Sequence, residues 1–310
     1  DLFLDAALDQ WTQLVGENQG EIAAFPQSGF HWPIWYNTAI FEEAGVEIPT
    51  TYDELFAAAD AIRAAGYQPF AIGGGDWTGY RFSQMIMSSN MSMDEANALY
   101  SKGDFSENEN ALEGMEAFVE LRDGGVFVDD FEGLEFASMN ELFFSGQAAM
   151  MHGGSWSYAN CPDELVDDVY LGGFPLLDTS LYDKPAALAG FTAKGIHITR
   201  NGSQKLDTVR LFIEYFYSTE NVARFVEEAS NFSPTTNVEV DEAKLQPLFA
   251  QSLELPERVT FVFLPEMSIP AGGINPAWRD YSPSYYIPDD LTAEEILVGV
   301  DAIYDELLVE

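Results

Sequence analysis

The most informative stretch of the sequence is residues 142–156, LFFSGQAAMMHGGSW. It predicts the end of a helix stopped by Gly146, then a short apolar strand, and then a glycine–glycine turn. The turn brings Trp156 to the end of the strand. A large, flat aromatic ring in that place suits a ligand cleft, but it also suits the filling of the next layer of core. This segment leaves both interpretations open.

Helices and short apolar strands alternate outward from this stretch. Capping boxes, in which Ser or Thr is followed three residues later by Glu, mark helix starts at Thr51, Ser106, Ser138 and Thr292. Further helices are expected after Ser203 and Ser218. Apolar runs bounded by turn residues predict strands at 21–25, 34–36, 69–72, 148–151, 169–174 and 191–199. The alternation predicts an α/β fold, with region 256–288 forming ordered but irregular structure.

The size and composition fit a folded protein. The chain has 310 residues, which predicts one large domain or two of ordinary size, and 47% of them are hydrophobic. No apolar run is long enough to cross a bilayer, and the first residues lack the pattern of a signal peptide. The single cysteine, Cys161, excludes an internal disulfide, and the histidines lack metal-site spacing. We therefore expect no metal and no cofactor.

Acidic residues dominate the charge. There are 52 Asp and Glu residues against 13 Lys and Arg, which gives a formal net charge of -39. Such a surface repels phosphate backbones and anionic lipid, so nucleic acid is excluded as a partner. The excess is typical of adaptation to high salt, where screening weakens self-repulsion. A disordered acidic chain is the competing interpretation, and the aromatic and aliphatic content argues against it.

Recognisable catalytic motifs are absent from the sequence. It contains no GxSxG elbow, Walker P-loop or GxGxxG fingerprint. Gly73-Gly74-Gly75 follows a predicted strand, but a phosphate bound there would meet Asp76 first. With so many acids, some pair will have glycosidase spacing by chance, and no local motif singles one out. A glycan hydrolase therefore remains an alternative.

Several aromatic residues lie next to predicted turns, where a ligand can reach them. They are Phe30, His31 and Trp32 before a predicted strand, Trp77 after the triple glycine, Trp156, and Trp278. A sugar has an apolar C–H face and a rim of hydroxyls, which match a flat ring and nearby carboxylates or amides. Core packing is the alternative for each ring. Trp11 and Trp35 are expected to be core residues of a helix and a strand.

Several motifs occur in an order that is typical of one protein family. They are WYNTAIFEEAGV at 35–46, PTTYDEL at 49–55, the segment 143–156, GFPLL at 173–177, the segment 190–199, and STENVA at 218–223. The first two are similar to YNK-x-LFEEAGL-x-PPTTWDEL, and the third is similar to F-x-x-GKAAM-x-x-x-G-x-W. These stretches belong to family 1 extracellular solute-binding proteins, the maltose-binding-protein-like sugar receptors of ABC importers. The resemblance runs from about Pro26 to the C-terminus.

The resemblance implies a periplasmic-binding-protein-like (class II) fold of two α/β lobes, which close like a hinge on a ligand between them. The implied divisions are 1–36 in the first lobe, 37–188 in the second, 189–230 returning to the first, and 231–310 packing mainly on the second. The chain would cross between lobes at residues 36–37 and near 189–191. Since only residues 1–36 precede the first crossing, the first lobe is expected to be truncated. Either the chain is a fragment, or the missing part sits on another chain.

We expect the ligand site to comprise Phe30, His31, Trp32, Asp76, Trp77, Gly154, Trp156, Asn275 and Trp278. The resemblance implies Phe30, His31, Asp76, Trp77, Trp156 and Trp278 among them, and Trp156 corresponds to the family's sugar-stacking tryptophan. Asp76, with nearby amides, is expected to fix sugar hydroxyls. No catalytic residue is expected.

The sequence thus predicts an extracytoplasmic carbohydrate receptor, in the periplasm or lipid-anchored at the cell surface. It would deliver a mono- or oligosaccharide to the transmembrane subunits of an ABC permease. We expect it to be a monomer, and we expect it not to be an enzyme. The alternatives are a glycan hydrolase and a receptor for a non-sugar solute such as a phosphodiester. The shortage of Lys and Arg near the cleft segments argues against an anionic solute.

Overall fold

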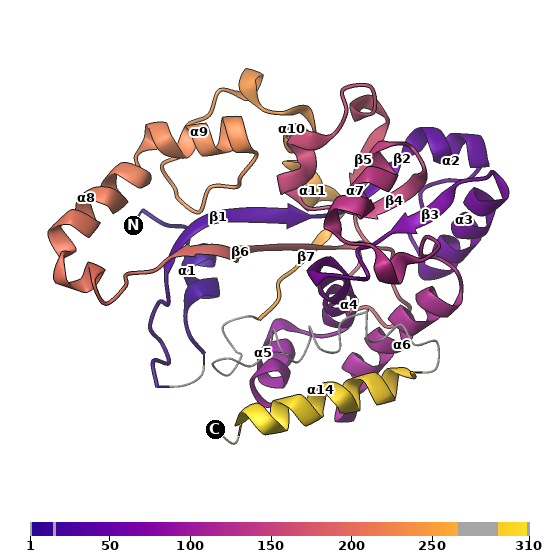
Figure 1. Cartoon of the computed structure of the whole chain (residues 1–310), viewed down its shortest axis with the longest axis horizontal. Coiled ribbons are helices and arrows are strands. Elements are labelled where there is room, and N and C mark those ends of the chain that lie inside the picture. Colours follow the sequence, from indigo (N-terminus) through magenta and orange to yellow (C-terminus); the bar gives the residue numbers. More distant parts are fainter. Residues whose placement is uncertain (1, 15–16, 266–290, 309–310) are drawn as a thin grey trace.

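The fold is built on two β-sheets that meet near the middle of the molecule (Figure 1). The computed structural model describes residues 2–14, 17–265 and 291–308. One sheet has three strands in the order β1-β6-β7, and the other has four in the order β3-β4-β2-β5. Helices pack around the sheets, so the α/β prediction is confirmed.

The three-stranded sheet is dominated by two long strands. β1 (Phe25–Trp32) runs antiparallel to β6 (Ala186–Ile196), and β7 (Thr260–Val262) runs parallel to β6. The strand predicted at 21–25 is misplaced, and the strand predicted at 191–199 is confirmed only in part, because β6 begins at Ala186 and ends at Ile196. The sequence of β1, FPQSGFHW, has no apolar alternation, because its pairing with β6 and not a local pattern keeps it extended.

The four-stranded sheet forms the buried centre of the larger part of the molecule. β4 (Ala148–His152) lies between β3 (Gln68–Ala71), with which it is parallel, and the antiparallel β2 (Ile34–Asn37). β5 (Val169–Gly172) pairs with the other side of β2. Every residue of β2 and β4 is buried, as their continuous apolar sequences predict. The strands predicted at 34–36, 69–72, 148–151 and 169–174 are confirmed to within a few residues.

The helices confirm some of the predicted capping boxes and not others. The described helices are α1 (Asp5–Trp11), α2 (Thr38–Ala44), α3 (Tyr52–Ala64), α4 (Trp77–Ser89), α5 (Met93–Lys102), α6 (Glu109–Asp123), α7 (Phe136–Phe144), α8 (Leu206–Phe216), α9 (Thr219–Ala229), α10 (Pro247–Ser252), α11 (Leu255–Arg258) and α14 (Ala293–Leu308). Thr51 caps α3 and Thr292 caps α14, each in a reciprocal box with the predicted Glu. No described helix is both long enough and apolar enough to cross a membrane.

Two predicted capping boxes are wrong, and a third helix start is displaced. α6 begins after Asn108, whose side chain accepts from the amide of Ala111, while the hydroxyl of Ser106 donates to Asp301 of α14. Ser138 lies inside α7. α8 begins after residue 205, because Ser203 is used in a preceding 3₁₀ turn. The Ser-x-x-Glu pattern at Ser106 does not indicate a cap here, because the Ser106 hydroxyl is hydrogen-bonded to Asp301, which is distant in the sequence.

The chain passes from one sheet to the other through a single residue. Pro33 separates β1 from β2, so the change of sheet comes before the predicted residues 36–37, which lie at the end of β2. The return is made near the isolated bridge between Phe174 and Ala186, at the start of β6. Residues 189–191 lie within β6. The lobe divisions drawn from the sequence stay predictions.

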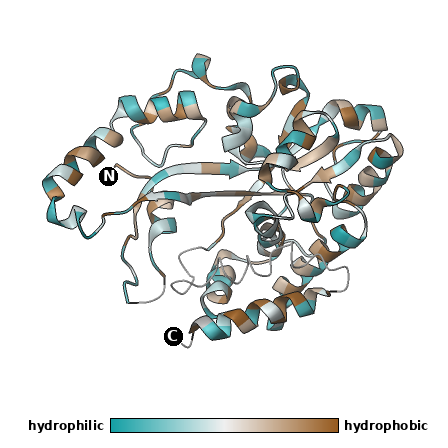
Figure 2. Ribbon diagram, viewed as in Figure 1, coloured by the Kyte–Doolittle hydropathy of each residue, from teal (hydrophilic) through white to brown (hydrophobic). Residues whose placement is uncertain are grey.

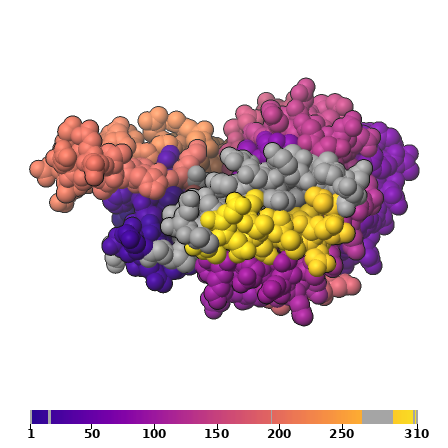
Figure 3. Space-filling model, turned by 60° about the horizontal axis from the view of Figure 1, so that its bottom comes forward, coloured from indigo at the N-terminus to yellow at the C-terminus, as the bar shows by residue number. Residues whose placement is uncertain are grey.

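The parts of the molecule around the two sheets are packed unequally. α14 lies across α6 and the 3₁₀ helix η1 (Phe105–Glu107), and it covers one side of the larger part (Figure 3). By contrast, α8 projects at the far end of the three-stranded sheet and has no buried residue (Figures 1 and 2). Four of its large apolar residues, Leu206, Leu211, Phe212 and Tyr215, are exposed, with Leu211 and Tyr215 at 67% and 69%.

Candidate ligand-binding site

Three tryptophan rings meet where the two sheets join. Trp32 ends β1, Trp77 begins α4, and Trp156 lies in the 3₁₀ helix η3 (Ser155–Asn160) after β4. Their ring centroids are 5.2 Å apart for Trp32 and Trp77, 5.0 Å for Trp32 and Trp156, and 5.7 Å for Trp77 and Trp156. These residues, far apart in the sequence, form one continuous aromatic surface, which we call the indole cluster.

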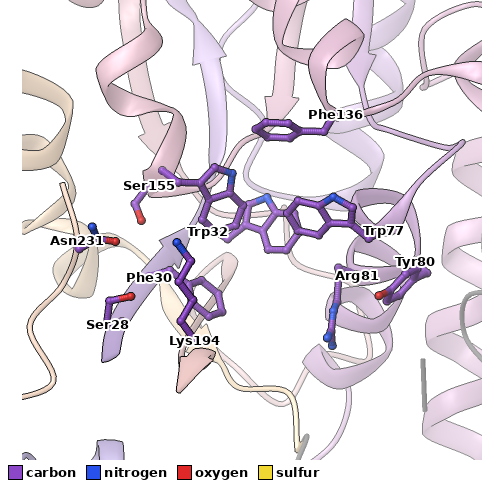
Figure 4. A pocket seen from close by; sticks show the side chains of 12 residues that line it. Ser28, Phe30, Trp32, Trp77, Tyr80, Arg81, Phe136, Ser155, Lys194 and Asn231 are labelled. Atoms are coloured by element: carbon purple, nitrogen blue, oxygen red, sulfur yellow. The ribbon is translucent and has the colours of Figure 1, made fainter. Parts of the chain in front are cut away.

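The indole cluster lines a pocket of about 430 Å³ (Figure 4), a size typical of small-molecule sites. The lining residues are Ser28, Gly29, Phe30, Trp32, Trp77, Tyr80, Arg81, Phe136, Ser155, Trp156, Lys194 and Asn231. They come from both sheets and their helices: β1 and β6 on one side, and α4, α7 and η3 on the other. The pocket therefore lies across the junction at Pro33.

The three rings differ in exposure and so in what they offer a ligand. Trp77 is 41% exposed and Trp156 is half-buried, whereas Trp32 is only 3% exposed. The indole N–H of Trp32 donates to the carbonyl of His152 at 3.0 Å, which fixes its orientation. Trp77 and Trp156 can therefore present ring surface to a ligand. The buried ring of Trp32 packs against both of them and holds them in place.

His152 supports the indole cluster from inside the four-stranded sheet. Its ring stacks on Trp32 with centroids 4.4 Å apart and planes 4° from parallel, and Phe82 lies 5.0 Å away. In the described part of the chain neither ring nitrogen has a hydrogen-bond partner. Burial lowers the pKa of His152 from 6.5 to about 3, so the imidazole is neutral at ordinary pH.

The glycine–glycine turn before Trp156 is required by close contacts. A Cβ atom on Gly154 would lie 2.2 Å from Cζ2 of Trp156, because the indole folds back over the Gly154 backbone. A Cβ on Gly153 would lie 2.6 Å from the indole nitrogen of Trp35, which donates to the Gly153 carbonyl. Space for two indoles, and not an unusual backbone conformation, thus explains both glycines.

Asp76 has a structural task that differs from its predicted contact with sugar hydroxyls. Asp76 caps α4, because its Oδ1 accepts hydrogen bonds from the backbone N–H and the hydroxyl of Thr78. Its Oδ2 accepts from the backbone N–H of Phe136 at 2.7 Å, which ties the start of α7 to the start of α4. Asp76 does not line the pocket; it positions two residues that do, Trp77 and Phe136, whose rings lie 5.9 Å apart.

Phe30, His31 and Trp32 are expected next to a turn before a strand, but they form the end of the strand β1. Side chains alternate along a strand, so Phe30 and Trp32 line the pocket and His31 points away. His31 packs between Phe232 and Phe261, with centroids 3.8 and 4.4 Å away, and burial lowers its pKa to about 4. Asn275 and Trp278 lie outside the described residues.

Sequence reasoning missed the other pocket residues, which are Ser28, Gly29, Tyr80, Arg81, Phe136, Ser155, Lys194 and Asn231. Tyr80 and Arg81 follow Trp77 by three and four positions on one helix, so they share its face, and that spacing was available in the sequence. Lys194 reaches the pocket because β6 pairs with β1. Asn231 reaches it from the segment of chain that follows α9. Nothing local in the sequence indicates them.

The buried imidazole of His152 predicts a pH dependence of stability. Between pH 6.5 and about 3 the unfolded chain binds a proton at this residue that the folded chain does not. The free energy of unfolding therefore falls as pH drops through this window, by about 1.4 kcal/mol per pH unit. We expect His152→Phe, which keeps a stacked ring and the backbone carbonyl, to remove this part of the slope.

Urea unfolding of the wild type and His152→Phe at pH 7, 6 and 5 measures the difference. The titration of His31 and of the many carboxylates contributes equally to both proteins, so it cancels in the comparison. Identical slopes in the two proteins would contradict a buried neutral imidazole.

Comparison with known proteins identifies the family. Residues 1–223 match the model of the family described as bacterial extracellular solute-binding protein. A Rhizobium meliloti protein named "Probable sugar-binding periplasmic protein" is 27% identical over 164 residues, which are 51% of this chain and 37% of that protein. A Brucella suis protein of the same name is 28% identical over 165 residues, 49% of this chain and 38% of that protein. The match thus spans little more than a third of these curated relatives.

Solved structures agree with the family match. A probable secreted solute-binding lipoprotein from Streptomyces coelicolor has a TM-score of 0.83 and 33% identity, over 98% of this chain and 75% of that chain. A chitin oligosaccharide binding protein has a TM-score of 0.81 at 22% identity, over 100% of this chain and 76% of that chain, which shows the fold alone. These likenesses confirm the periplasmic-binding-protein-like fold, and the extracellular family confirms the expected location outside the cytoplasm. The chain belongs to the bacterial extracellular solute-binding protein family.

Proposed function

We propose that the protein is a carbohydrate receptor that delivers a sugar to the membrane subunits of an ABC importer. The observation that carries this proposal is the indole cluster, which lines a pocket at the junction of the two sheets. Two similar periplasmic proteins carry names that describe them as sugar-binding, which supports the same conclusion.

The chemistry of the pocket suits a sugar. The exposed faces of Trp77 and Trp156 match the C–H faces of pyranose rings, and Phe30 extends this surface, with its ring 5.8 Å from that of Trp156. Hydroxyl groups of Ser28 and Ser155 and the amide of Asn231 supply donors and acceptors at the edge (Figure 4). Flat apolar surface bordered by polar groups favours a ligand of the same mixed character.

The connections between the sheets support closure on the ligand. Pocket residues lie on both sides of the junction, which the chain crosses at Pro33 and near the bridge of Phe174 with Ala186. A rotation about these crossings would change the distance between the two walls of the pocket without unfolding either sheet. We propose that the sugar favours the closed arrangement because only there do both walls contact it.

The proposed role is binding without catalysis, by a monomer. Glycosidases use a pair of carboxyl groups that flank the scissile bond. Among the described residues, the pocket lining includes no Asp or Glu. A search for new reducing ends after incubation with oligosaccharides tests this point, and their appearance would favour the hydrolase instead.

Removing an exposed indole tests the receptor proposal. Trp77→Ala is expected to raise the sugar Kd about tenfold or more, because covering part of an indole contributes roughly 1–2 kcal/mol. Calorimetry against a panel of mono- and oligosaccharides supplies the measurement. Tyr215→Ala is the matched control, since Tyr215 is an exposed aromatic residue on α8 that does not line the pocket. If both variants bind sugar as the wild type does, the indole cluster is not the binding surface.

Gly154→Ala tests the placement of the Trp156 indole without removing it. The added methyl group forces the ring to move, so we expect the Kd to rise about fivefold, or roughly 1 kcal/mol, with a changed near-ultraviolet circular dichroism spectrum. Gly133→Ala is the control, because no described atom lies within 4 Å of the added group. Unchanged affinity and spectrum in Gly154→Ala would show that the ring position does not matter.

A further inference from the structure

The pocket has a polar end and an aromatic end (Figure 4). Ser28, Ser155 and Asn231 gather at one end, with their side chains directed into the pocket. Trp77 and Phe136 occupy the other end, where their rings lie 5.9 Å apart and present flat apolar surface. A ligand that fills the pocket therefore meets different chemistry at its two ends.

Long-range pairing brings the three polar side chains together. Ser28 lies on β1, and the backbone N–H of Gly29 beside it donates to the carbonyl of Phe232 at 2.7 Å. This isolated bridge holds the chain that follows α9 against β1 and so brings Asn231 to the pocket. Ser155 comes from the other sheet, at the start of η3, which packs on β1. The polar end is therefore assembled only in the folded chain.

These polar groups have no internal task that explains them. Ser28 is 8% exposed and Ser155 only 2%. Among the described residues, neither hydroxyl group nor the amide group of Asn231 has a hydrogen-bond partner, in contrast to the carboxylate of Asp76. Water can satisfy such groups in an open pocket, but a ligand that displaces the water must replace its hydrogen bonds. The polar end therefore favours a ligand whose groups can both donate and accept.

The polar end is also the closed end of the pocket. The adjoining cavity behind Ser28 and Asn231 measures only about 10 Å³, so a chain of sugar units cannot continue in that direction. Trp77, by contrast, is 41% exposed and leaves the aromatic end open to solvent. A pyranose unit at the polar end would therefore be the last unit of its chain, and further units would extend over Trp77. The two basic lining residues, Lys194 and Arg81, lie toward opposite ends, so charge does not set this direction.

We propose that the polar end determines selectivity by binding the hydroxyl groups of one terminal sugar unit, while the aromatic end accepts the C–H face of many sugars; this rests on the proposed receptor function. Hydroxyl and amide groups match sugar hydroxyls because both donate and accept. A site built to hydrogen-bond a hydroxyl group rejects an analogue that lacks it, because polar groups of the site are then left unpaired. Stacking on an indole discriminates less, since pyranoses share apolar C–H faces.

Oligosaccharides that lack a single hydroxyl group test the direction of binding. The probe is whichever of maltotriose, cellotriose, xylotriose and chitotriose binds tightest by calorimetry, compared with analogues deoxygenated at one position of either end unit. We expect at least one deoxygenation at one end to raise the Kd about tenfold or more, and those at the other end to stay within about twofold. Equal effects at both ends, or binding of monosaccharides alone, would overturn the inference and leave the receptor standing. If none of these oligosaccharides and no monosaccharide binds, the receptor proposal itself fails.

Serine variants locate the effect. Ser28→Ala and Ser155→Ala are each expected to weaken binding of the parent sugar about fivefold or more and to reduce the penalty for the sensitive deoxygenated analogue. Trp77→Ala is expected to weaken the binding of parent and analogue alike, which separates stacking from hydroxyl recognition. Because neither serine hydroxyl has an internal partner among the described residues, we expect the urea midpoint of both alanine variants to be unchanged or higher.

Ser203→Ala is the control for these variants, because Ser203 is exposed and lies outside the pocket. It is expected to bind the parent sugar and each analogue as the wild type does. Parallel losses for parent and analogue in both pocket serine variants, or no loss in either, would contradict the role assigned to the polar end.

Discussion

The contact between Trp32 and His152 is where the two sheets of the protein are joined. Trp32 ends β1 of one sheet and His152 ends β4 of the other, and they are linked by a ring stack and by an N–H to carbonyl hydrogen bond. The indoles of Trp77 and Trp156 both rest on Trp32. Because Trp32 is almost fully buried, core packing fixes its position. Its ring in turn restricts where the more exposed rings of Trp77 and Trp156 can lie. Among the residues that the structure describes, the buried imidazole of His152 has no partner for its nitrogens, which is unfavourable by itself, so the stack must offset that cost.

Several local constraints then act on the rings around Trp32. Gly154 gives room for the indole of Trp156, and the carboxylate of Asp76 fixes the starts of α4 and α7, from which Trp77 and Phe136 enter the pocket. Their common effect is to hold aromatic rings partly in water, where hydrophobic burial alone would not keep them. Such an arrangement is explained by ligand binding better than by packing.

The sequence predicted the elements better than the side-chain roles. The continuous apolar runs of β2 and β4 and the reciprocal caps of α3 and α14 are local features, and they were found. β1 was missed because its extended form depends on β6, far along the chain. For the same reason His31 was placed with Phe30, although strand alternation turns it to the opposite face. Turn residues precede Trp77 and Trp156 and mark them in the sequence, and both line the pocket. Lys194 and Asn231 carry no such local mark.

The acidic composition acts on the whole molecule and not on the pocket alone. With a net charge of -39, repulsion between like charges opposes the compact state. In molar salt the screening length falls to about 3 Å, so most of this repulsion is removed. Contacts between an indole ring and the C–H face of a sugar do not depend on the net charge of the protein, and they persist under the same conditions. An acidic surface and a pocket built on tryptophan rings are therefore compatible, because salt weakens the general repulsion and leaves the ring contacts intact.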